Sequence, residues 1–315
     1  MHILVTGANG FIGAALCRRL LELAAQQPQR WPLERLTAVD LQTEALPAHP
    51  RLHAVQGSFA DPPVLAAALA EPVDLVFHLA SVPSGRSESD PALGMAVNVQ
   101  GTLHLLDRLK AAGSVPRLVF ASSIAVYGRP QAPLVTDDTA PAPTLSYGAH
   151  KVIGEVLVDD YARRGWIRGC SLRLPGIVAR PPEPNGAVSI FLSNLLRELA
   201  AGRPFVCPTS SAATTWLMSL GCCIDNLVHA AQQEFLTRRT FLLPPLRVAL
   251  GELAEAVGDA FAVADVGALV RWQPDPWVEF NFGSYPPLQL PAAEAAGFRS
   301  DGSLGALVRA ALADA

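Results

Sequence analysis

The sequence has no basic block, no long apolar run and few cysteines, and each of these absences excludes a class of protein. Its 315 residues carry a net charge of −4 without a basic cluster, which argues against nucleic acid as the main partner. No apolar run reaches the roughly 18 residues that a membrane span requires, so no membrane association is expected. The opening segment has no basic leader and no small-residue cleavage site, and we therefore expect no signal peptide.

Cysteine and histidine show no spacing typical of a metal site or of a disulfide framework. No CxxC pair occurs, and a disulfide between the adjacent Cys222 and Cys223 would be strained. No metal site is therefore expected. A reducing, cytoplasmic location fits best. The other cysteines are Cys17, Cys170 and Cys207.

Half of the residues are apolar and 17% are charged, so the chain can bury a sizeable core. Its first two thirds alternate short apolar runs with helical patterns, which predicts an α/β fold with a doubly wound, Rossmann-type parallel sheet. Because each strand is short and continuously apolar, we expect all of them to be buried. The expected strands are His2–Thr6, Leu36–Asp40, Leu52–Gln56, Leu75–Leu79, Arg117–Ser122 and Ser171–Leu174. The expected helices include Ile12–Ala25, Pro63–Ala70, Gly94–Ala112 and Tyr147–Arg164.

The alternation of short apolar runs with helical patterns ends after about Ile177. Three prolines make Arg180–Gly186 a loop, and Ser189–Ala201 and Asp301–Ala315 have helical patterns. The segments Ile224–Glu234 and Leu246–Val257 remain unassigned and pack either on the sheet or on the smaller part. We therefore expect a larger domain at 1–175, joined by residues around 220–235, and a smaller subdomain at 176–315.

A glycine-rich turn follows the first strand and opens the first helix. Gly7 permits a tight turn, Gly10 lets the backbone approach a pyrophosphate, and Gly13 lets helix and strand pack closely. Free N–H groups and the helix dipole then face the phosphates. The alternative is an ordinary glycine-rich turn. The expected cofactor contacts here also include Asn9, Phe11 and Ile12.

The second strand ends at Asp40, whose carboxylate can accept both hydroxyls of an adenosine ribose and would repel a 2′-phosphate. Leu41 follows, with no arginine or lysine for a phosphate. The pattern favours NAD over NADP, with a helix cap or turn as the alternative role of Asp40.

Tyr147 and Lys151 lie four residues apart, on one face of a predicted helix. A free phenol has a pKa near 10, and lowering it by about three units requires roughly 4 kcal/mol of selective stabilisation of the phenolate. A nearby ammonium can supply that stabilisation, helped by a positively charged nicotinamide. The spacing therefore indicates an acid–base pair.

Two serines end another strand, where ligands bind in open α/β sheets. We expect Ser123 to hold the substrate oxygen and Ser122 to lie nearer the cofactor, with a local turn or cap as the alternative for either. Tyr127 is expected to be structural.

Small residues end the fourth predicted strand at Leu79, Ala80 and Ser81, as a backbone that lies against a cofactor requires. We interpret His78 as a core histidine rather than a base. Asn98 is expected to brace the backbone of the site, with a surface position as the alternative.

With these residues in place, the chain resembles the extended short-chain dehydrogenases, the family that includes nucleotide-sugar epimerases and dehydratases. The resemblance covers nearly the whole length and rests on TGANGFIG, HLAS, NVQGT, ASSIAVYG, YGAHK and LRLPGIV. It implies that Ser123 is catalytic and that the segment with Pro175 and Ile177 folds over the nicotinamide. It also implies a homodimer built on helices such as Gly94–Ala112 and Tyr147–Arg164.

The second half is similar to members of that family that oxidise a four-carbon sugar acid at C2 to a 2-oxo acid. This likeness implies a small sugar-acid substrate and a cationic or polar anchor for it. Gly57-Ser58 departs from the Gly-Asp of the family, which puts an adenine contact at Ser58 in doubt, and Leu243-Pro244-Pro245-Leu246 replaces a more glycine-rich segment. Candidate substrate residues are Ser84, Arg86, Arg180, Asn185 and Trp216, of which the arginines, Asn185 and Trp216 have surface, structural or core roles as alternatives.

Two other functions remain open. A nucleotide-sugar epimerase or dehydratase would use the same catalytic residues but usually needs arginines for a diphosphate, and Ser189–Ser219 offers only Arg197 and Arg203. A non-catalytic dinucleotide sensor would commonly lack the tyrosine or the lysine, and this chain has both.

Overall fold

The computed structural model describes residues 1–129, 131–181, 189–235 and 237–313. These residues form two compact units. The first comprises Met1–Val126, Leu145–Arg173 and Leu227–Phe241, and the second comprises Tyr127–Thr144, Leu174–Asn226 and Leu242–Ala315. The predicted boundary at residue 175 lies beside Leu174, but Tyr127–Thr144 belongs to the second unit, because β6 (Val135–Thr136) pairs there with β14 (Leu288–Gln289).

The first unit is built on a sheet in which seven strands of the described chain follow the order β11-β7-β5-β4-β1-β2-β3. β1 runs parallel to β2 and β4, β2 to β3, and β4 to β5, so the predicted Rossmann-type sheet is confirmed. The strands are β1 (His2–Thr6), β2 (Arg35–Asp40), β3 (Leu52–Gln56), β4 (Leu75–His78), β5 (Arg117–Ser123), β7 (Arg168–Leu174) and β11 (Thr240–Leu242).

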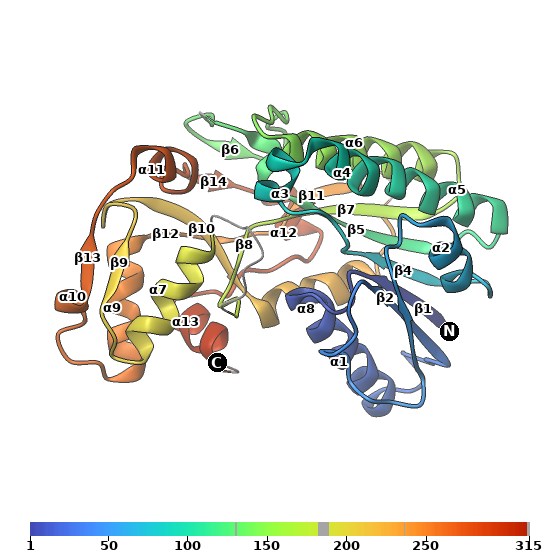
Figure 1. Ribbon diagram of the computed structural model, residues 1–315, viewed down its shortest axis with the longest axis horizontal. Coiled ribbons are helices and arrows are strands. Elements are labelled where there is room, and N and C mark those ends of the chain that lie inside the picture. Colours follow the sequence, from blue (N-terminus) through green and yellow to red (C-terminus); the bar gives the residue numbers. More distant parts are fainter. Residues whose placement is uncertain (130, 182–188, 236, 314–315) are drawn as a thin grey trace. The chain divides into compact units, whose positions relative to one another are not determined.

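Helices cover both faces of this sheet (Figure 1). On one face, apolar side chains of α2, α5 and α6 form a single core with the strands, while α1 lies on the opposite face. Each leucine buried in this core contributes about 1.5–3 kcal/mol. The helices of this unit are α1 (Phe11–Gln26), α2 (Pro62–Ala68), α3 (Ser84–Ser89), α4 (Pro91–Gly94), α5 (Thr102–Ala112) and α6 (Ser146–Arg163).

The strand predictions agree with the structure to within a residue, except that β7 begins three residues earlier than expected, at Arg168. The expectation that every strand is buried is wrong for β3. All of its residues are exposed or half-buried, because β3 is the last strand at one edge of the sheet and lacks a neighbour on that side.

The predicted helix Gly94–Ala112 is not one regular helix. A π-helical segment, Met95–Gly101, separates α4 from α5 and carries Asn98. Such wide turns frequently occur at functional sites. Helix α5 ends at Gly113, the usual left-handed stop, where φ is +69° and an added Cβ would meet nothing within 4 Å.

The second unit packs helices α7, α9 and α13 around a core of its own. Within it, Leu246–Val257 divides into the strand β12, which pairs with β10, and helix α9. Its strands are β6, β8 (Gly176–Val178), β9 (Phe205–Cys207), β10 (Thr214–Ser219), β12 (Leu246–Ala249), β13 (Val270–Trp272) and β14. Its helices are α7 (Ile190–Ala200), α8 (Leu220–Ala230, whose last residues belong to the first unit), α9 (Leu250–Phe261), α10 (Val266–Leu269), α11 (Pro276–Phe282), α12 (Pro291–Ala295) and α13 (Leu304–Leu312).

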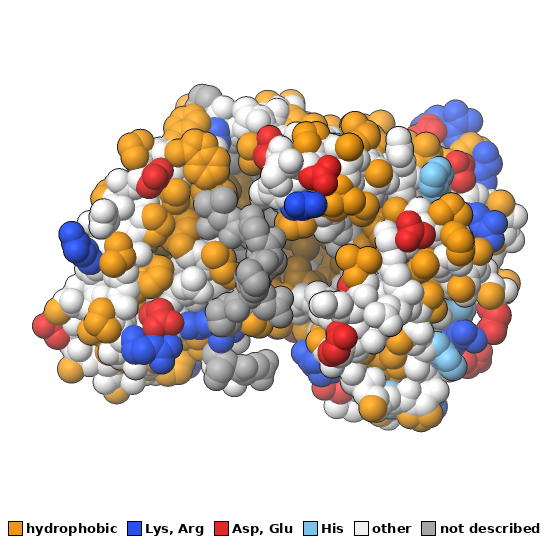
Figure 2. Space-filling model, in the orientation of Figure 1, with side chains coloured by type: hydrophobic (Ala, Val, Ile, Leu, Met, Phe, Trp, Pro, Cys, Tyr) orange, Lys and Arg blue, Asp and Glu red, His pale blue; other side chains and the backbone are white. Residues whose placement is uncertain are grey.

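Surface charge is mixed. On the face that Figure 2 shows, acidic and basic side chains are interspersed among apolar ones. Within the described ranges, no helix is long and apolar enough to cross a membrane, and no three His, Cys, Asp or Glu side chains gather as metal ligands. All five cysteines carry free thiols.

Gly154 allows α6 to lie close to β5, because a Cβ there would stand 2.5 Å from Cζ of Phe120. We expect Gly154→Ala to destabilise the protein by about 1–3 kcal/mol, since the added methyl overpacks the core. Thermal unfolding measures the effect. Gly221→Ala in α8 is the matched control: its Cβ would meet nothing within 4 Å, and the higher helix propensity should stabilise by up to about 1 kcal/mol. An equal rise in Tm for both variants would contradict this packing.

Candidate active site

The glycine-rich turn between β1 and α1 has the geometry of a phosphate cradle. Gly7 has φ +72°, and a Cβ there would lie 2.7 Å from the amide nitrogen of Ala80. A Cβ at Gly13 would lie 2.0 Å from the carbonyl oxygen of Gly7, so both positions exclude a side chain. A Cβ at Gly10 would meet only that same carbonyl oxygen, at 3.4 Å, and Gly10 is exposed. The open position is therefore the one expected to face a pyrophosphate, with Phe11 and Ile12 beginning the helix behind it.

Asp40 ends β2 beside this turn. Its carboxylate accepts hydrogen bonds from the backbone amides of Asn9 at 2.9 Å and Leu41 at 2.7 Å. The side-chain oxygen of Asn9 in turn accepts from the amide of Ala45 at 2.7 Å. Asp40 thus shapes the loop at the sheet edge, which accounts for the turn role that the sequence left open; its contact with a ribose stays a prediction.

Ser58 lies near Asp40, because the amide of the preceding Gly57 donates to the Asp40 carbonyl at 2.8 Å. The Ser58 hydroxyl accepts from the amide of Ala60 at 3.2 Å and so closes a local turn. The adenine contact of Ser58 stays a prediction.

The end of β4 fits against the glycine turn. The amides of Leu79 and Ala80 donate to the backbone carbonyl and the hydroxyl of Thr6, at 3.1 and 3.4 Å. Ser81 continues this half-buried backbone. The three residues line the same edge of the sheet as Gly7, where the sequence predicted a cofactor contact.

His78 is a core histidine, as predicted. Its ring nitrogens hydrogen-bond to the hydroxyls of Thr6 at 2.7 Å and Thr102 at 2.9 Å. Burial, together with the charge of Lys151, lowers the pKa of His78 to about 3, so its ring is neutral at physiological pH.

Asn98 is buried and braces the backbone beyond β4. Its side-chain oxygen accepts from the amide of Val82 at 2.7 Å, and its nitrogen donates to the Val82 carbonyl at 3.0 Å. The same nitrogen lies 3.4 Å from Nδ1 of His150 on α6. The bracing role therefore accounts for this side chain, while a direct contact of Asn98 with a cofactor stays a prediction.

Tyr147 and Lys151 lie together on α6. The Lys151 ammonium is 5.5 Å from the centre of the Tyr147 ring and 4.9 Å from that of Phe120. It donates to the carbonyl of Ala121 at 2.7 Å. Burial lowers the pKa of Lys151 to about 7, against the attraction of Glu155. Because a desolvated ammonium is stabilised by a nearby anion, the phenolate of Tyr147 is a favourable partner.

The two serines at the end of β5 differ in environment. The hydroxyl of Ser122 is buried and donates to Glu155 at 2.5 Å, while a contact of Ser122 with a cofactor stays a prediction. The Ser123 hydroxyl is half-buried and accepts from the amide of Ala125 at 3.2 Å. Its donor hydrogen remains available for a substrate oxygen.

The predicted substrate residues of the first unit lie on and near α3. Ser84 begins that helix and is half-buried. The guanidinium of Arg86 is 58% exposed and pairs with Asp90 at 3.2 Å, which fits the surface role that the sequence also allowed.

The remaining predicted residues lie in the second unit. Trp216 has no exposed surface and donates from its indole nitrogen to the carbonyl of Pro286 at 2.8 Å, so the core role accounts for it. The amide of Arg180 donates to Ser193 at 2.9 Å. Pro175 precedes β8, in which Ile177 pairs with Met218; contact of Pro175 and Ile177 with nicotinamide stays a prediction. Asn185 lies outside the described residues.

Sequence reasoning missed Glu155 and Arg173. Their side chains are 6% and 10% exposed and form a two-point ion pair, with Nε of Arg173 2.9 Å and Nη2 2.8 Å from the carboxylate oxygens. Two signals pointed to them: Glu155 follows Lys151 by four residues, and Arg173 interrupts an otherwise apolar strand.

A nicotinamide dinucleotide fits this edge of the first unit on three observations. The cradle is open only at Gly10, the Asp40 carboxylate stands beside it, and the Tyr147–Lys151 pair comes from the same unit. The glycine turn would hold the pyrophosphate, Asp40 the ribose, and Lys151 would face the nicotinamide end.

We expect Asp40→Ala to weaken NAD binding about tenfold or more, because two charge-assisted hydrogen bonds to the ribose are lost, while NADP binding changes much less. Titration calorimetry with both dinucleotides measures this. Asp40→Asn is the matched control, since it removes the charge and keeps one oxygen that can accept from the Asn9 amide. An equal loss of NAD and NADP affinity in the alanine variant would contradict the assignment.

Lys151→Met should stabilise the protein without cofactor, and more at pH 6 than at pH 9. Lys151 has a pKa of about 7 in the fold against 10.5 ordinarily, so between these values the unfolded chain holds a proton that the folded chain has released. Because the unfolded chain binds more protons in this window, the free energy of unfolding of wild type, relative to that of the variant, rises as the pH rises from about 7 to about 10.5. The free-energy cost of burying Lys151 in wild type therefore decreases as the pH rises. Denaturant unfolding should show that Lys151→Met raises the free energy of unfolding more at pH 6 than at pH 9, by on the order of 2 kcal/mol. A gain that is larger at pH 9 would contradict the burial of the charge.

The comparisons with known proteins agree with this geometry. Residues 3–217 match the family model described as NAD dependent epimerase/dehydratase family. A protein named D-erythronate dehydrogenase from Cupriavidus necator is 39% identical, with 100% of this chain and 99% of that protein covered. One of the same name from Haemophilus influenzae is 33% identical, with 82% and 84% covered.

Among solved structures, one titled as the nucleoside-diphosphate-sugar epimerase from Agrobacterium tumefaciens superposes with a TM-score of 0.91 at 32% identity. It covers 100% of this chain and 94% of its own. The predicted resemblance, fold and cofactor are confirmed. The chain belongs to the NAD dependent epimerase/dehydratase family.

Proposed function

We propose that the chain is an NAD-dependent dehydrogenase that oxidises a secondary alcohol of a small sugar acid, such as D-erythronate, to a 2-oxo acid. The observation that carries the proposal is the buried Lys151 ammonium 5.5 Å from the ring of Tyr147. Two relatives named D-erythronate dehydrogenase, one matched over the whole chain, support the substrate class.

The three catalytic side chains divide the proton chemistry. The Tyr147 oxygen accepts the proton of the substrate hydroxyl, and Lys151 stabilises the phenolate that makes this transfer possible near neutral pH. Ser123 donates to the substrate oxygen as it becomes a carbonyl. NAD, when bound, supplies the acceptor for the hydride from the same carbon.

The alternative function, epimerisation or dehydration of a nucleotide sugar, has the Agrobacterium structure's title in its favour. Enzymes of that kind usually bind the diphosphate through arginines of the smaller domain. Arg197 donates to the backbone carbonyls of Ala179 and Arg180, at 2.6 and 3.1 Å, and Arg203 forms an exposed pair with Glu198. Both guanidiniums are therefore engaged within the fold, which favours the dehydrogenase.

We also propose that the enzyme is a cytoplasmic homodimer. Ile153 and Val156 expose 38% and 63% of their surface on α6, one of the helices expected at a dimer interface. The free state of all five thiols supports a reducing compartment.

The test is a panel of four- to six-carbon sugar acids with NAD, followed by NADH absorbance, with UDP-sugars as the control. We expect net reduction of NAD with a four-carbon acid. Tight retention of NAD through purification, with no net reduction by any acid, would support the epimerase instead.

Tyr147→Phe should lower kcat at least about a hundredfold, because the variant retains the ring but lacks the group that accepts the proton. The dissociation constant for NAD, measured in parallel, should change little. A near-normal turnover in a correctly folded variant would rule out the mechanism.

A further inference from the structure

Helix α6 carries a third polar residue in line with its catalytic pair. Tyr147, Lys151 and Glu155 are spaced by four residues and therefore share one face of the helix. Glu155 is 5% exposed. Its carboxylate accepts hydrogen bonds from Ser122 on β5 and from Arg173 on β7.

Lys151 and Glu155 hold two consecutive residues of β5. Lys151 donates to the carbonyl of Ala121 at 2.7 Å, and Glu155 accepts from the hydroxyl of Ser122 at 2.5 Å. The next residue is Ser123. The end of β5 is thus fixed to α6 at two points directly before the serine expected to contact the substrate.

We propose that Glu155 is a positioning residue: it fixes the end of β5 that carries Ser123, and it supplies the opposite charge one helical turn from Lys151 on the same face of α6. Arg173 completes the arrangement by orienting the carboxylate through two hydrogen bonds from the adjacent strand. The inference rests on the proposed function, since it assigns Glu155 to the same Ser123, Tyr147 and Lys151.

Among the titratable groups named here around Lys151, Glu155 carries the negative charge that stabilises the ammonium. Tyr147 and His150 come from α6, and His78 comes from β4. Burial lowers the pKa of both histidines, which are therefore neutral near pH 7, while the attraction of Glu155 raises the pKa of Lys151 against its burial. Arg173 forms its ion pair with the carboxylate of Glu155.

A purely structural role would be to tie α6 to β7. Buried ion pairs contribute little net stability, because desolvation of both charges offsets their attraction. The two roles differ in one measurable respect. Only the positioning role makes the protonation of Lys151 depend on Glu155.

The sequence offers a direct readout of that protonation, because Lys110 and Lys151 are its two lysines. Carbon-13 labelling at lysine Cε therefore gives two resonances, one from exposed Lys110 as an internal reference. In Glu155→Gln, the pKa of Lys151 should fall by about one unit or more, because an opposite charge is lost. The alkaline limb of the pH profile of kcat/KM should move to lower pH by a similar amount.

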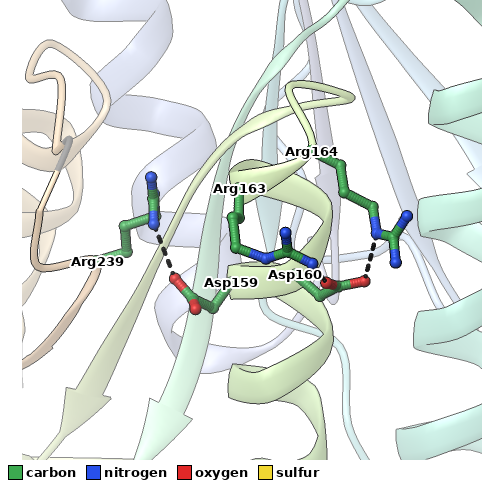
Figure 3. Close-up of polar contacts among 5 residues, drawn as sticks. All are labelled: Asp159, Asp160, Arg163, Arg164 and Arg239. Atoms are coloured by element: carbon green, nitrogen blue, oxygen red, sulfur yellow. Dashed lines mark hydrogen bonds and ion pairs between the residues drawn. The ribbon is translucent and has the colours of Figure 1, made fainter.

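Two control variants separate charge from position. Asp159→Asn makes the same change one turn further along α6, where Asp159 is 53% exposed and pairs with Arg239 at 3.0 Å (Figure 3). It should leave the Lys151 titration unchanged. Ser122→Ala removes the hydrogen bond to β5 but keeps the charge, so kcat should fall roughly tenfold with the Lys151 pKa unaltered.

Glu155→Gln leaves Arg173 without its charged partner and can prevent folding. The second variant, Glu155→Met with Arg173→Met, removes both charges, and its Lys151 should still titrate lower than in wild type. A folded variant of either kind with the wild-type Lys151 titration would overturn the proposal, as would Ser122→Ala with unchanged kcat. The titration needs no substrate, so inactivity of wild type on every sugar acid would refute the proposed function alone.

Discussion

The Lys151 ammonium lies in the interior of the first unit, where water cannot solvate it. Few groups replace that water: the Ala121 carbonyl, the face of Phe120, the ring of Tyr147 and the charge of Glu155. An isolated buried charge is strongly unfavourable, so the lysine gains from any anion formed beside it. Burial of the Lys151 ammonium destabilises the fold, and the same burial favours ionisation of Tyr147 to a phenolate beside it. The fold thus gives up some stability for a group that can accept a proton.

The packing of the first unit holds Lys151 in this buried position. Helix α6 approaches β5 closely because Gly154 leaves room for Phe120. The π-helical turn at Met95–Gly101 carries Asn98, which holds the backbone at Val82, and His78 fills the space between β4 and α5 without a charge. Each of these polar groups is hydrogen-bonded, so the edge of the sheet is shaped before any ligand arrives.

Sequence patterns predicted much of this unit and less of the second. Continuous apolar runs located β1 and β3 to the residue, and the glycine and tyrosine–lysine spacings indicated the candidate site, because these signals are local. The exposure of β3 depends on its place in the sheet order, and the π-helical turn depends on contacts with distant residues, so neither is visible in one segment. Leu246–Val257 changes from strand to helix within one apolar run, which periodicity cannot divide.

The Asp40 carboxylate already receives two backbone amides, from Asn9 and Leu41, before any ribose reaches it. The side chain expected to select the dinucleotide thus also shapes the loop expected to bind its phosphates. Redesign toward a phosphorylated ribose consequently requires more than a reversal of charge at this position. The loop must also acquire a new acceptor for its amides, so specificity and architecture have to be changed together.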